Sequence, residues 1–198
     1  GVALGDVTPA MRRAAKAVNF GIVYGISAFS LSQDIGVTVA EAKAYMEAYF
    51  ATFPGVRKYM DDVVAKAKER GYVETLFGRR RYLPELASSN FNMRAFGERV
   101  ARNMPIQGTA ADIIKIAMVH VRNRLKAEKL DAKLILQVHD ELIVECPEAE
   151  SDTVKKILEE EMANAVQLSV PMLAEAGSGK SWYQACLLYT SDAADDRI

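Results

Sequence analysis

Residues 134–146 read LILQVHDELIVEC, two aliphatic runs that are joined at His139 and Asp140. Runs of this kind predict two buried β-strands, and a two-residue connection between them predicts a tight hairpin turn. Asp140 and Glu141 would then lie at or next to the tip of a buried ribbon. Two adjacent carboxylates in such a place need an explanation.

Two interpretations of these carboxylates stay open on the local sequence. In the first, His139 and Asp140 merely form the turn. In the second, the carboxylates bind a divalent cation. The strongly apolar flanks predict a sheet packed on both faces, where removing an ion from water is costly unless something compensates. Mg²⁺ needs only one or two protein carboxylates when it also holds substrate phosphates.

Upstream of this hairpin the sequence pattern is mostly helical. Thr8-Pro9 is a typical helix start, and Gly71 is a typical helix stop. Helices are predicted over residues 9–24, 39–53 and 54–70, and a short hairpin that turns at Gly78 is predicted in YVETLFGRRRYL, residues 72–83.

A long helical pattern begins at Asn90 and continues to about residue 129. We expect Pro105 and Gly108 to interrupt it, and Thr109 to restart it through a capping box with Asp112. Downstream, we expect an acidic amphipathic helix over residues 148–165 and a last strand in SVPMLAEA, residues 169–176. This order predicts an α+β fold, with a helical subdomain attached to a small antiparallel sheet.

Composition predicts a soluble globular protein that does not contact membranes. Half of the 198 residues are hydrophobic, but no apolar run reaches the ~18 to 20 residues that span a bilayer. With only two cysteines and no visible signal peptide, we expect a cytoplasmic protein.

The charges are distributed unevenly along the chain. Residues 1–133 carry 21 Lys and Arg against 13 Asp and Glu, whereas residues 134–198 carry 4 against 13. A basic region beside an acidic one suits a polyanion held near divalent cations, and it suits two solvated faces of an ordinary protein equally well.

The predicted helix over residues 9–24 has two unlike faces at about 100° per residue. Its apolar stripe contains Met11, Ala15, Val18 and Ile22, and the opposite side contains Arg12, Arg13, Lys16, Phe20 and Tyr24. The cations alone are typical of a solvated basic face. The two aromatic residues in line with them are not, and together they suit a nucleoside triphosphate, which combines phosphates with a flat base.

Four segments along the chain resemble family A DNA polymerases, the DNA polymerase I type. They are RRAAKAVNFGIVYG (12–25), TLFGRRRYLPEL (75–86), RNMPIQGTAADIIK (102–115) and LQVHDELIVE (136–145). The resemblance covers residues 1 to about 185. It implies a polymerase fold with a helical fingers subdomain over residues 1–89 and a partial palm over residues 90–186. Residues 187–198 do not resemble the family and are expected to be a non-native tail.

The resemblance implies that the helix over residues 9–24 binds an incoming deoxynucleoside triphosphate. Arg12 and Lys16 would grip the triphosphate, and Lys16 would also donate a proton to the leaving pyrophosphate. Phe20 would stack on the nucleotide, and a Phe at this position goes with rejection of nucleotides that lack a 3′-hydroxyl. Tyr24 would stack near the templating base.

The resemblance also implies template-directed DNA synthesis on primer–template DNA, with transfer of a nucleotide from dNTP to the primer 3′-hydroxyl. Asp140 corresponds to the metal-binding aspartate of the palm hairpin, and Glu141 is a neighbouring carboxylate of lesser importance. His139 would lie by the primer terminus. Two Mg²⁺ ions would be held where the primer 3′-oxygen meets the α-phosphate. The full-length enzyme is expected to be a monomer.

Further residues are expected to contact DNA. Arg99, Asn103 and Gln107 are spaced four apart, and the family uses matching residues to touch the minor groove of the new duplex, where acceptors recur in every base pair. Without the resemblance, a polar surface face would explain them. Arg81, in the triplet of residues 79–81, and Arg13 are candidates for phosphate contact, although solvated turn arginines are common.

The chain departs from the family in one important respect. The family's other palm carboxylate motif, of Asp-Tyr-Ser type, is absent from the 198 residues. Because that aspartate shares the two metals with Asp140, we expect this fragment to be inactive by itself. The absent strand would also leave an exposed sheet edge beside the hairpin.

Two other functions are considered. A non-catalytic duplex-binding module would use the Arg99 face alone, but it would not need Arg12, Lys16 and Asp140. A P-loop NTPase would use AEAGSGKS, residues 174–181, but such a loop needs a strand before it and a helix after it, and Trp182-Tyr183 gives no clear helix start.

Overall fold

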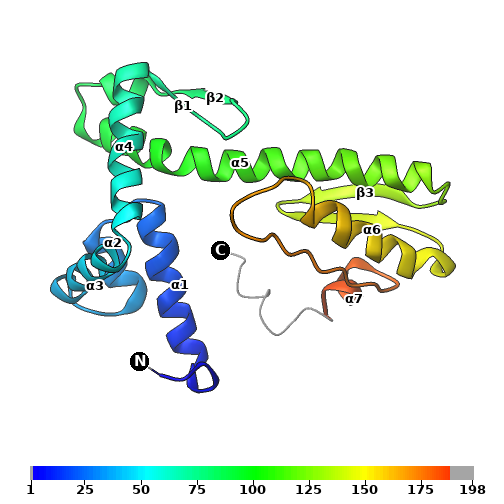
Figure 1. Cartoon of the computed structure of the whole chain (residues 1–198). Helices are drawn as coiled ribbons and strands as arrows, with labels where there is room; N and C mark the ends of the chain where they lie inside the picture. The colour runs from blue at the N-terminus through cyan, green and yellow to red at the C-terminus, as the bar shows by residue number, and fades with distance from the viewer. Residues whose placement is uncertain (1, 188–198) are drawn as a thin grey trace. The chain divides into compact units, whose positions relative to one another are not determined.

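The computed structural model describes residues 2–187 and contains two compact units, which divide between Thr109 and Ala110 (Figure 1). One helix, α5 (Phe91–Ala127), contributes residues to both units. The boundary predicted between the fingers and the palm, at residues 89 and 90, lies within the first unit. The division into fingers and palm stays a prediction. The tail predicted over residues 187–198 lies outside the described residues, except for residue 187.

Unit 1 begins with four α-helices and a short hairpin. Three of the helices confirm the prediction, because Thr8 caps α1, a Thr38–Glu41 capping box starts α3, and Gly71 ends α4 with a φ of 78°. The helix α2, which Ser27 caps, was not predicted. The elements are η1 (Leu4–Asp6), α1 (Pro9–Val23), α2 (Ala28–Ile35), α3 (Val39–Thr52), α4 (Pro54–Arg70), β1 (Tyr72–Glu74), β2 (Arg80–Tyr82) and η2 (Pro84–Ala87).

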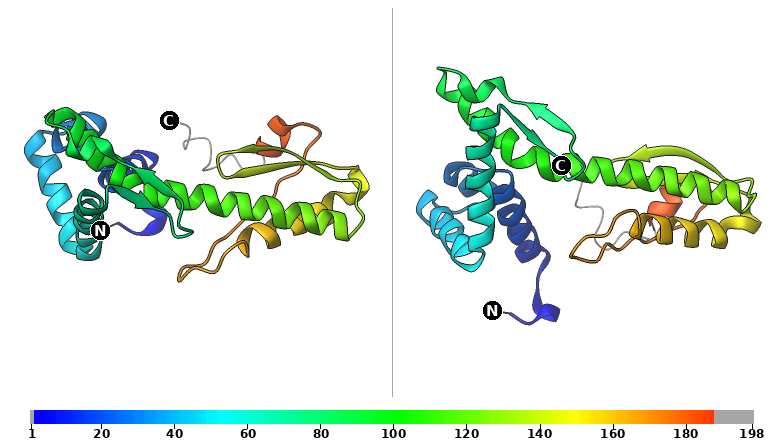
Figure 2. Two further views of the ribbon diagram at one scale, coloured as in Figure 1. Left: turned by 90° about the horizontal axis from the view of Figure 1, so that it is seen from above. Right: turned by 45° about the horizontal axis from the view of Figure 1, so that its top comes forward.

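The core of unit 1 joins α4, the β1–β2 hairpin, η2 and the first part of α5. Strands β1 and β2 pair antiparallel with Tyr72 opposite Tyr82, and Gly78 takes a φ of 80° in the turn, which confirms the predicted hairpin. Both views of Figure 2 show this hairpin alongside α5. The buried core residues are Val64, Ala67, Val73, Leu83, Leu86 and Ala101.

Helix α5 runs without a break, so the predicted interruption at Pro105 and Gly108 is wrong. Thr109 does not cap a new helix, because its hydroxyl donates to the Pro105 carbonyl within the same helix. Pro105 removes one helical N–H, but buried residues on either side of it, Ala101 before and Ile114 after, hold the helix together by tertiary packing.

Unit 2 combines the remainder of α5 with a two-stranded ribbon and an acidic helix. Strand β3 (Lys133–Val138) pairs antiparallel with β4 (Glu141–Glu145) across a two-residue turn, as predicted. After η3 (Glu148–Glu150), helix α6 (Ser151–Ala163) confirms the acidic helix, and α7 (Trp182–Leu187) follows an irregular segment. The α+β prediction is therefore confirmed. Across residues 2–187, no helix is long and apolar enough to cross a membrane.

Two expectations for unit 2 are wrong. In the described part of the chain, only one face of the ribbon is packed. Leu142 packs on the core of unit 2, whereas Ile135 and Leu136, at a β-bulge, are 54% and 45% exposed. SVPMLAEA forms no strand, and the Ala176 N–H instead donates to the Glu159 carboxylate. Among the described residues, β3 and β4 pair only with each other, so each strand has one edge without a strand partner.

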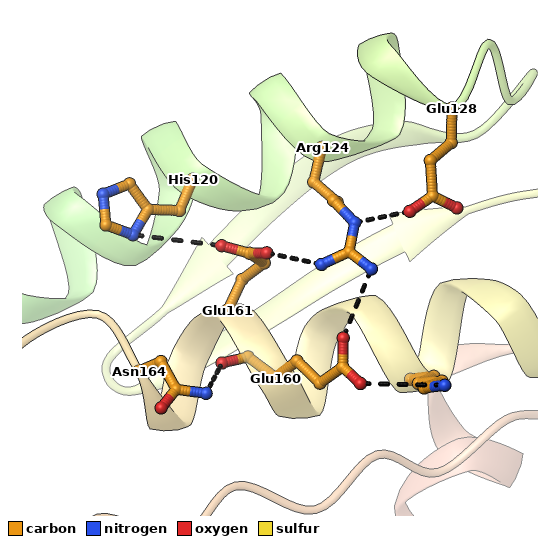
Figure 3. A network of polar contacts seen from close by, with 7 residues as sticks. His120, Arg124, Glu128, Glu160, Glu161 and Asn164 are labelled. Carbon is orange, nitrogen blue, oxygen red and sulfur yellow. Dashed lines mark hydrogen bonds and ion pairs between the residues drawn. The ribbon is translucent and has the colours of Figure 1, made fainter.

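A cluster of charges fastens α6 to α5 (Figure 3). The Arg124 guanidinium on α5 lies 2.9 Å from Glu161 and 3.3 Å from Glu160 of α6, and it also bonds to Glu128. Glu128 and Glu161 raise the pKa of Arg124. Beneath the cluster, the two helices share a core of Val121, Leu125, Val154 and Ile157.

Candidate functional site

Helix α1 presents one cation and two rings in a row. The Lys16 Nζ lies 5.8 Å from the Phe20 ring centroid, and the Phe20 and Tyr24 centroids are 6.0 Å apart. Phe20 is 50% exposed and Tyr24 36%, so both rings can be reached by a ligand. Arg12 and Arg13 are exposed one turn closer to the N-terminus. This face can hold an anion at one end and stack a flat apolar group at the other.

Helix α1 is anchored in unit 1 by its C-terminal half. Ile22 is buried, whereas Met11, on the same predicted apolar stripe, is 46% exposed. The helix ends in a Schellman motif, because the Ile26 N–H donates to the Gly21 carbonyl and the Gly25 N–H donates to the Ile22 carbonyl. The two rings therefore lie on the C-terminal half of α1, which burial of Ile22 and the Schellman motif fix in place.

Two arginines of α5 cover the end of α1. Gly25 has a φ of +76°, and a Cβ there would lie 3.4 Å from Arg102 Nη1 and 3.6 Å from Arg99 Cγ. Arg102 pairs with Glu98 at 3.5 Å, and Glu98 pairs with Lys68 of α4 at 2.6 Å. The hydrogen bond from Lys68 lowers the pKa of Glu98. Arg102, Glu98 and Lys68 were not predicted, because no motif in the sequence relates them.

Arg99, Asn103 and Gln107 share one face of α5, as predicted, because the helix is continuous there. Arg99 and Gln107 are exposed. The Asn103 Oδ1 is buried and has no hydrogen-bond partner in the described part of the chain. A buried acceptor without a partner costs about 1–3 kcal/mol.

The arginines of the β1–β2 hairpin are not equivalent. Arg80 stacks on the Tyr72 ring at 4.5 Å and pairs with Glu74 at 3.4 Å. Arg81 is exposed on the other face of the strand, opposite Val73 in the pairing register. Arg81 is therefore a better candidate for an external anion than Arg80.

The ribbon tip carries His139, Asp140 and Glu141, and all three are exposed. His139 has a φ of 53°, in the left-handed region that a two-residue hairpin turn uses, so the His-Asp pair does form the turn. The buried environment expected for the carboxylates is wrong. Their exposure leaves both accessible to a cation.

The tip has the donor chemistry of a partial Mg²⁺ site. Asp140 and Glu141 offer the carboxylate oxygens that Mg²⁺ prefers, and this ion commonly takes only one or two of them together with phosphates and water. No group of three or more His, Cys, Asp or Glu within residues 2–187 could hold a metal. The two carboxylates fit an ion whose other ligands come from elsewhere.

The predicted residues thus lie in two places. Unit 1 contains the α1 face (Arg12, Lys16, Phe20 and Tyr24), the α5 face (Arg99, Asn103 and Gln107) and the basic hairpin, which is the β1–β2 hairpin with its arginines. The first two faces meet where Arg99 packs on Gly25. Unit 2 contains the ribbon tip. The idea that α1 and the tip share one pocket stays a prediction.

The segment AEAGSGKS lacks the features of a phosphate loop. Residues 171–179 have no regular structure, although α7 does begin at Trp182. A Cβ at Gly177 or Gly179 would lie 2.7 Å or 2.8 Å from backbone atoms of Ala185, and the Lys180 N–H donates to the Gln184 side chain. Close packing on α7 explains these glycines without a phosphate.

Comparisons with known proteins agree on one family. Residues 1–184 match the family model "DNA polymerase family A". DNA polymerase I of Bacillus subtilis (strain 168) is 55% identical over 184 residues, which are 93% of this chain and 21% of that protein. DNA polymerase I of Geobacillus stearothermophilus is 55% identical over 180 residues, 91% of this chain and 20% of that protein.

A solved structure is also similar. The POL domain of Pol1 from M. smegmatis, in complex with DNA primer-template and dNTP, matches with a TM-score of 0.89 and 48% identity. The match covers 93% of this chain and 33% of that one. The chain spans about a fifth of the length of the curated relatives it matches.

Proposed function

Because the chain belongs to DNA polymerase family A, we propose that it supplies the nucleotide-binding helix and part of the catalytic centre of a template-directed DNA polymerase. The row of Lys16, Phe20 and Tyr24 on α1, with spacings of 5.8 Å and 6.0 Å, is the observation that carries this proposal. In this assignment, residues 1–89 are the fingers and residues 90–186 are part of the palm.

The α1 face binds the incoming dNTP. Arg12 and Lys16 hold the triphosphate, and Lys16 protonates the leaving pyrophosphate. Phe20 stacks on the nucleotide and Tyr24 stacks near the templating base. Family membership and the exposure of both rings support these roles.

The ribbon tip supplies the acidic part of the catalytic centre. Asp140, with a smaller contribution from Glu141, would hold two Mg²⁺ ions jointly with the substrate phosphates and an aspartate that is not among the 198 residues. When bound, such ions activate a hydroxyl nucleophile and neutralise the charge of the leaving group. His139 lies by the primer terminus. This sharing of ligands is why we expect the 198-residue chain alone to be inactive.

The duplex is held by α5. Arg99, Asn103 and Gln107 contact the minor groove of the newly formed base pairs, where a donor can test pair shape without reading sequence. The shared face of these residues on a continuous helix, and the exposure of Arg99 and Gln107, support this role. Arg13 and Arg81 contact backbone phosphates. The full-length enzyme acts in the cytoplasm as a monomer on primer–template DNA.

A chimaera tests the proposal. Residues 1–184 replace the matching 184 residues of the B. subtilis enzyme, and primer extension is measured. We expect the chimaera to be active, Lys16→Ala to lower the rate by about 10²- to 10⁴-fold, and Asp140→Ala to abolish activity. Lys180→Ala is the matched control and should change nothing. Phe20→Tyr should increase incorporation of nucleotides that lack a 3′-hydroxyl.

Two results would count against the proposal. A folded chimaera that binds duplex DNA but extends no primer would favour a non-catalytic duplex-binding module. Loss of activity in Lys180→Ala equal to that in Lys16→Ala would contradict the specific role proposed for the α1 face.

A further inference from the structure

The loop that leads into the arginines of the β1–β2 hairpin is organised around Thr75. This side chain is 4% exposed, and its hydroxyl accepts hydrogen bonds from the N–H groups of Phe77 and Arg79, both at 3.2 Å. Its own N–H donates to the Arg79 carbonyl at 3.0 Å, and its carbonyl accepts from the Gly78 N–H. One buried threonine therefore sets the path of the backbone up to the arginine triplet.

A second buried threonine fastens this loop to α5. The Thr109 side chain is 8% exposed, and its hydroxyl accepts from the Leu76 N–H at 3.1 Å while it donates to the Pro105 carbonyl. The contact is close, since a Cβ at Gly108 would lie 2.7 Å from Thr75 Cγ2. Both views of Figure 2 show the hairpin beside this helix.

The loop is organised although it lies on the surface. Leu76 and Phe77 are 73% and 48% exposed, so burial of their side chains does not explain why the backbone is held. Arg81 is exposed, while Arg80 is engaged with Tyr72 and Glu74. An anion that binds to an ordered loop does not have to restrict the loop's backbone, and binding is tighter for that reason.

We propose that Thr109 and Thr75 are positioning residues that pre-organise the basic hairpin for the phosphate backbone of DNA. This inference rests on the proposed function, because it takes the DNA duplex as the ligand. Thr109 supplies the contact to α5, and Thr75 supplies the shape of the loop. Neither threonine touches the DNA.

The test measures binding of a fluorescein-labelled primer–template duplex to the 198-residue chain by fluorescence anisotropy. Thr109→Val keeps the shape of the side chain but removes the acceptor for the Leu76 N–H. We expect it to weaken binding by about 3- to 10-fold, the equivalent of one net hydrogen bond. Thr109→Ser keeps the hydroxyl and should bind like the unmodified chain.

The decisive comparison uses a background in which Arg79 and Arg81 are both changed to Gln. There, Thr109→Val should have no further effect on binding, because the arginines whose position it controls are gone. An equal loss in both backgrounds, or no loss in the unmodified background, would overturn the proposal. Thr52→Val is the matched control, since the Thr52 hydroxyl also donates to a carbonyl four residues back, that of Ala48.

A second measurement needs no substitution at Thr109. In the unmodified chain, hydrogen exchange at the Leu76 amide should be slowed by its bond to Thr109, and exchange as fast as in an unstructured loop would overturn the proposal. If the unmodified chain does not bind the duplex at all, the inference fails, whereas the proposed function is tested separately by primer extension with the chimaera. A chain that binds but shows equal effects in both backgrounds rejects the inference on the threonines alone.

Discussion

Replacing Gly108 with alanine would place a Cβ in the tightly packed region between α5 and the loop of the β1–β2 hairpin. The new Cβ would lie 2.7 Å from Thr75 Cγ2 and 3.3 Å from Met104 Cε. Met104 can move, because its side chain is flexible. Thr75 is confined, since it is 4% exposed and its hydroxyl accepts hydrogen bonds from Phe77 and Arg79.

Opposing contributions set the size of the effect of Gly108→Ala. Alanine is favoured over glycine inside a helix by about 1 kcal/mol. Overpacking a core costs about 1–3 kcal/mol, and rotating Thr75 away would cost about 1–3 kcal/mol more for N–H groups left unpaired. These contributions leave a net loss of about 1–5 kcal/mol in the free energy of unfolding, and we expect the lower part of that range because the Met104 side chain can move. In a chain of this size, each kcal/mol lowers Tm by roughly 2–4 °C.

The assay is thermal unfolding followed by far-ultraviolet circular dichroism. Thr75→Ser removes the obstructing methyl group but keeps the hydroxyl, so the double variant should recover most of the loss, with a coupling energy of about 1–2 kcal/mol. Gly55→Ala in the first turn of α4 is the control, because nothing lies within 4 Å of a Cβ there. A Gly108→Ala chain as stable as the control, or a loss that Thr75→Ser does not relieve, would refute the packing argument.

Two further predictions concern stability. Ile157 of α6 is 1% exposed in the core of unit 2. Ile157→Ala should therefore lower the free energy of unfolding, measured by urea denaturation, by about 2–5 kcal/mol. A loss well under about 1 kcal/mol would contradict this burial. The hydrogen bond from Lys68 lowers the pKa of Glu98 in the folded state. At a pH above the usual pKa of Glu, the charged carboxylate therefore stabilises the folded state. This stabilisation is lost as the pH falls through the lowered pKa. The Tm difference between the unmodified chain and Glu98→Gln should therefore shrink between pH 7 and about pH 3, and a constant difference would argue against the pair.

Local signals in the sequence predicted most of the elements and part of the site. Thr8, Thr38 and Gly71 act within a few residues of themselves, so the helices they start or end were predictable. The row on α1 was predictable because helical geometry alone places Lys16 and Phe20 on one face. The same holds for the hairpin tip, where a two-residue connection leaves few turn types.

The interruption predicted at Pro105 shows where local signals stop being sufficient. Proline and glycine are helix breakers by local conformational preference, and the 37-residue helix α5 passes through both. Burial of Ala101 and Ile114 outweighs that preference. Neither burial is visible in a local window, because each depends on which segments pack against the helix.

By itself, the sequence determined the starts of α1 and α3, the end of α4, the two hairpins, the face of α1 and membership of the family, since each depends on neighbouring residues or on extended similarity. Only the tertiary structure decided that α5 is continuous, that the ribbon is covered on one face, and that Arg102, Glu98 and Lys68 meet beside Gly25. It also decided that Thr109 bonds to Leu76, 33 residues away. Contacts between residues distant in the chain form only when packing brings their backbones together, and no local pattern records them.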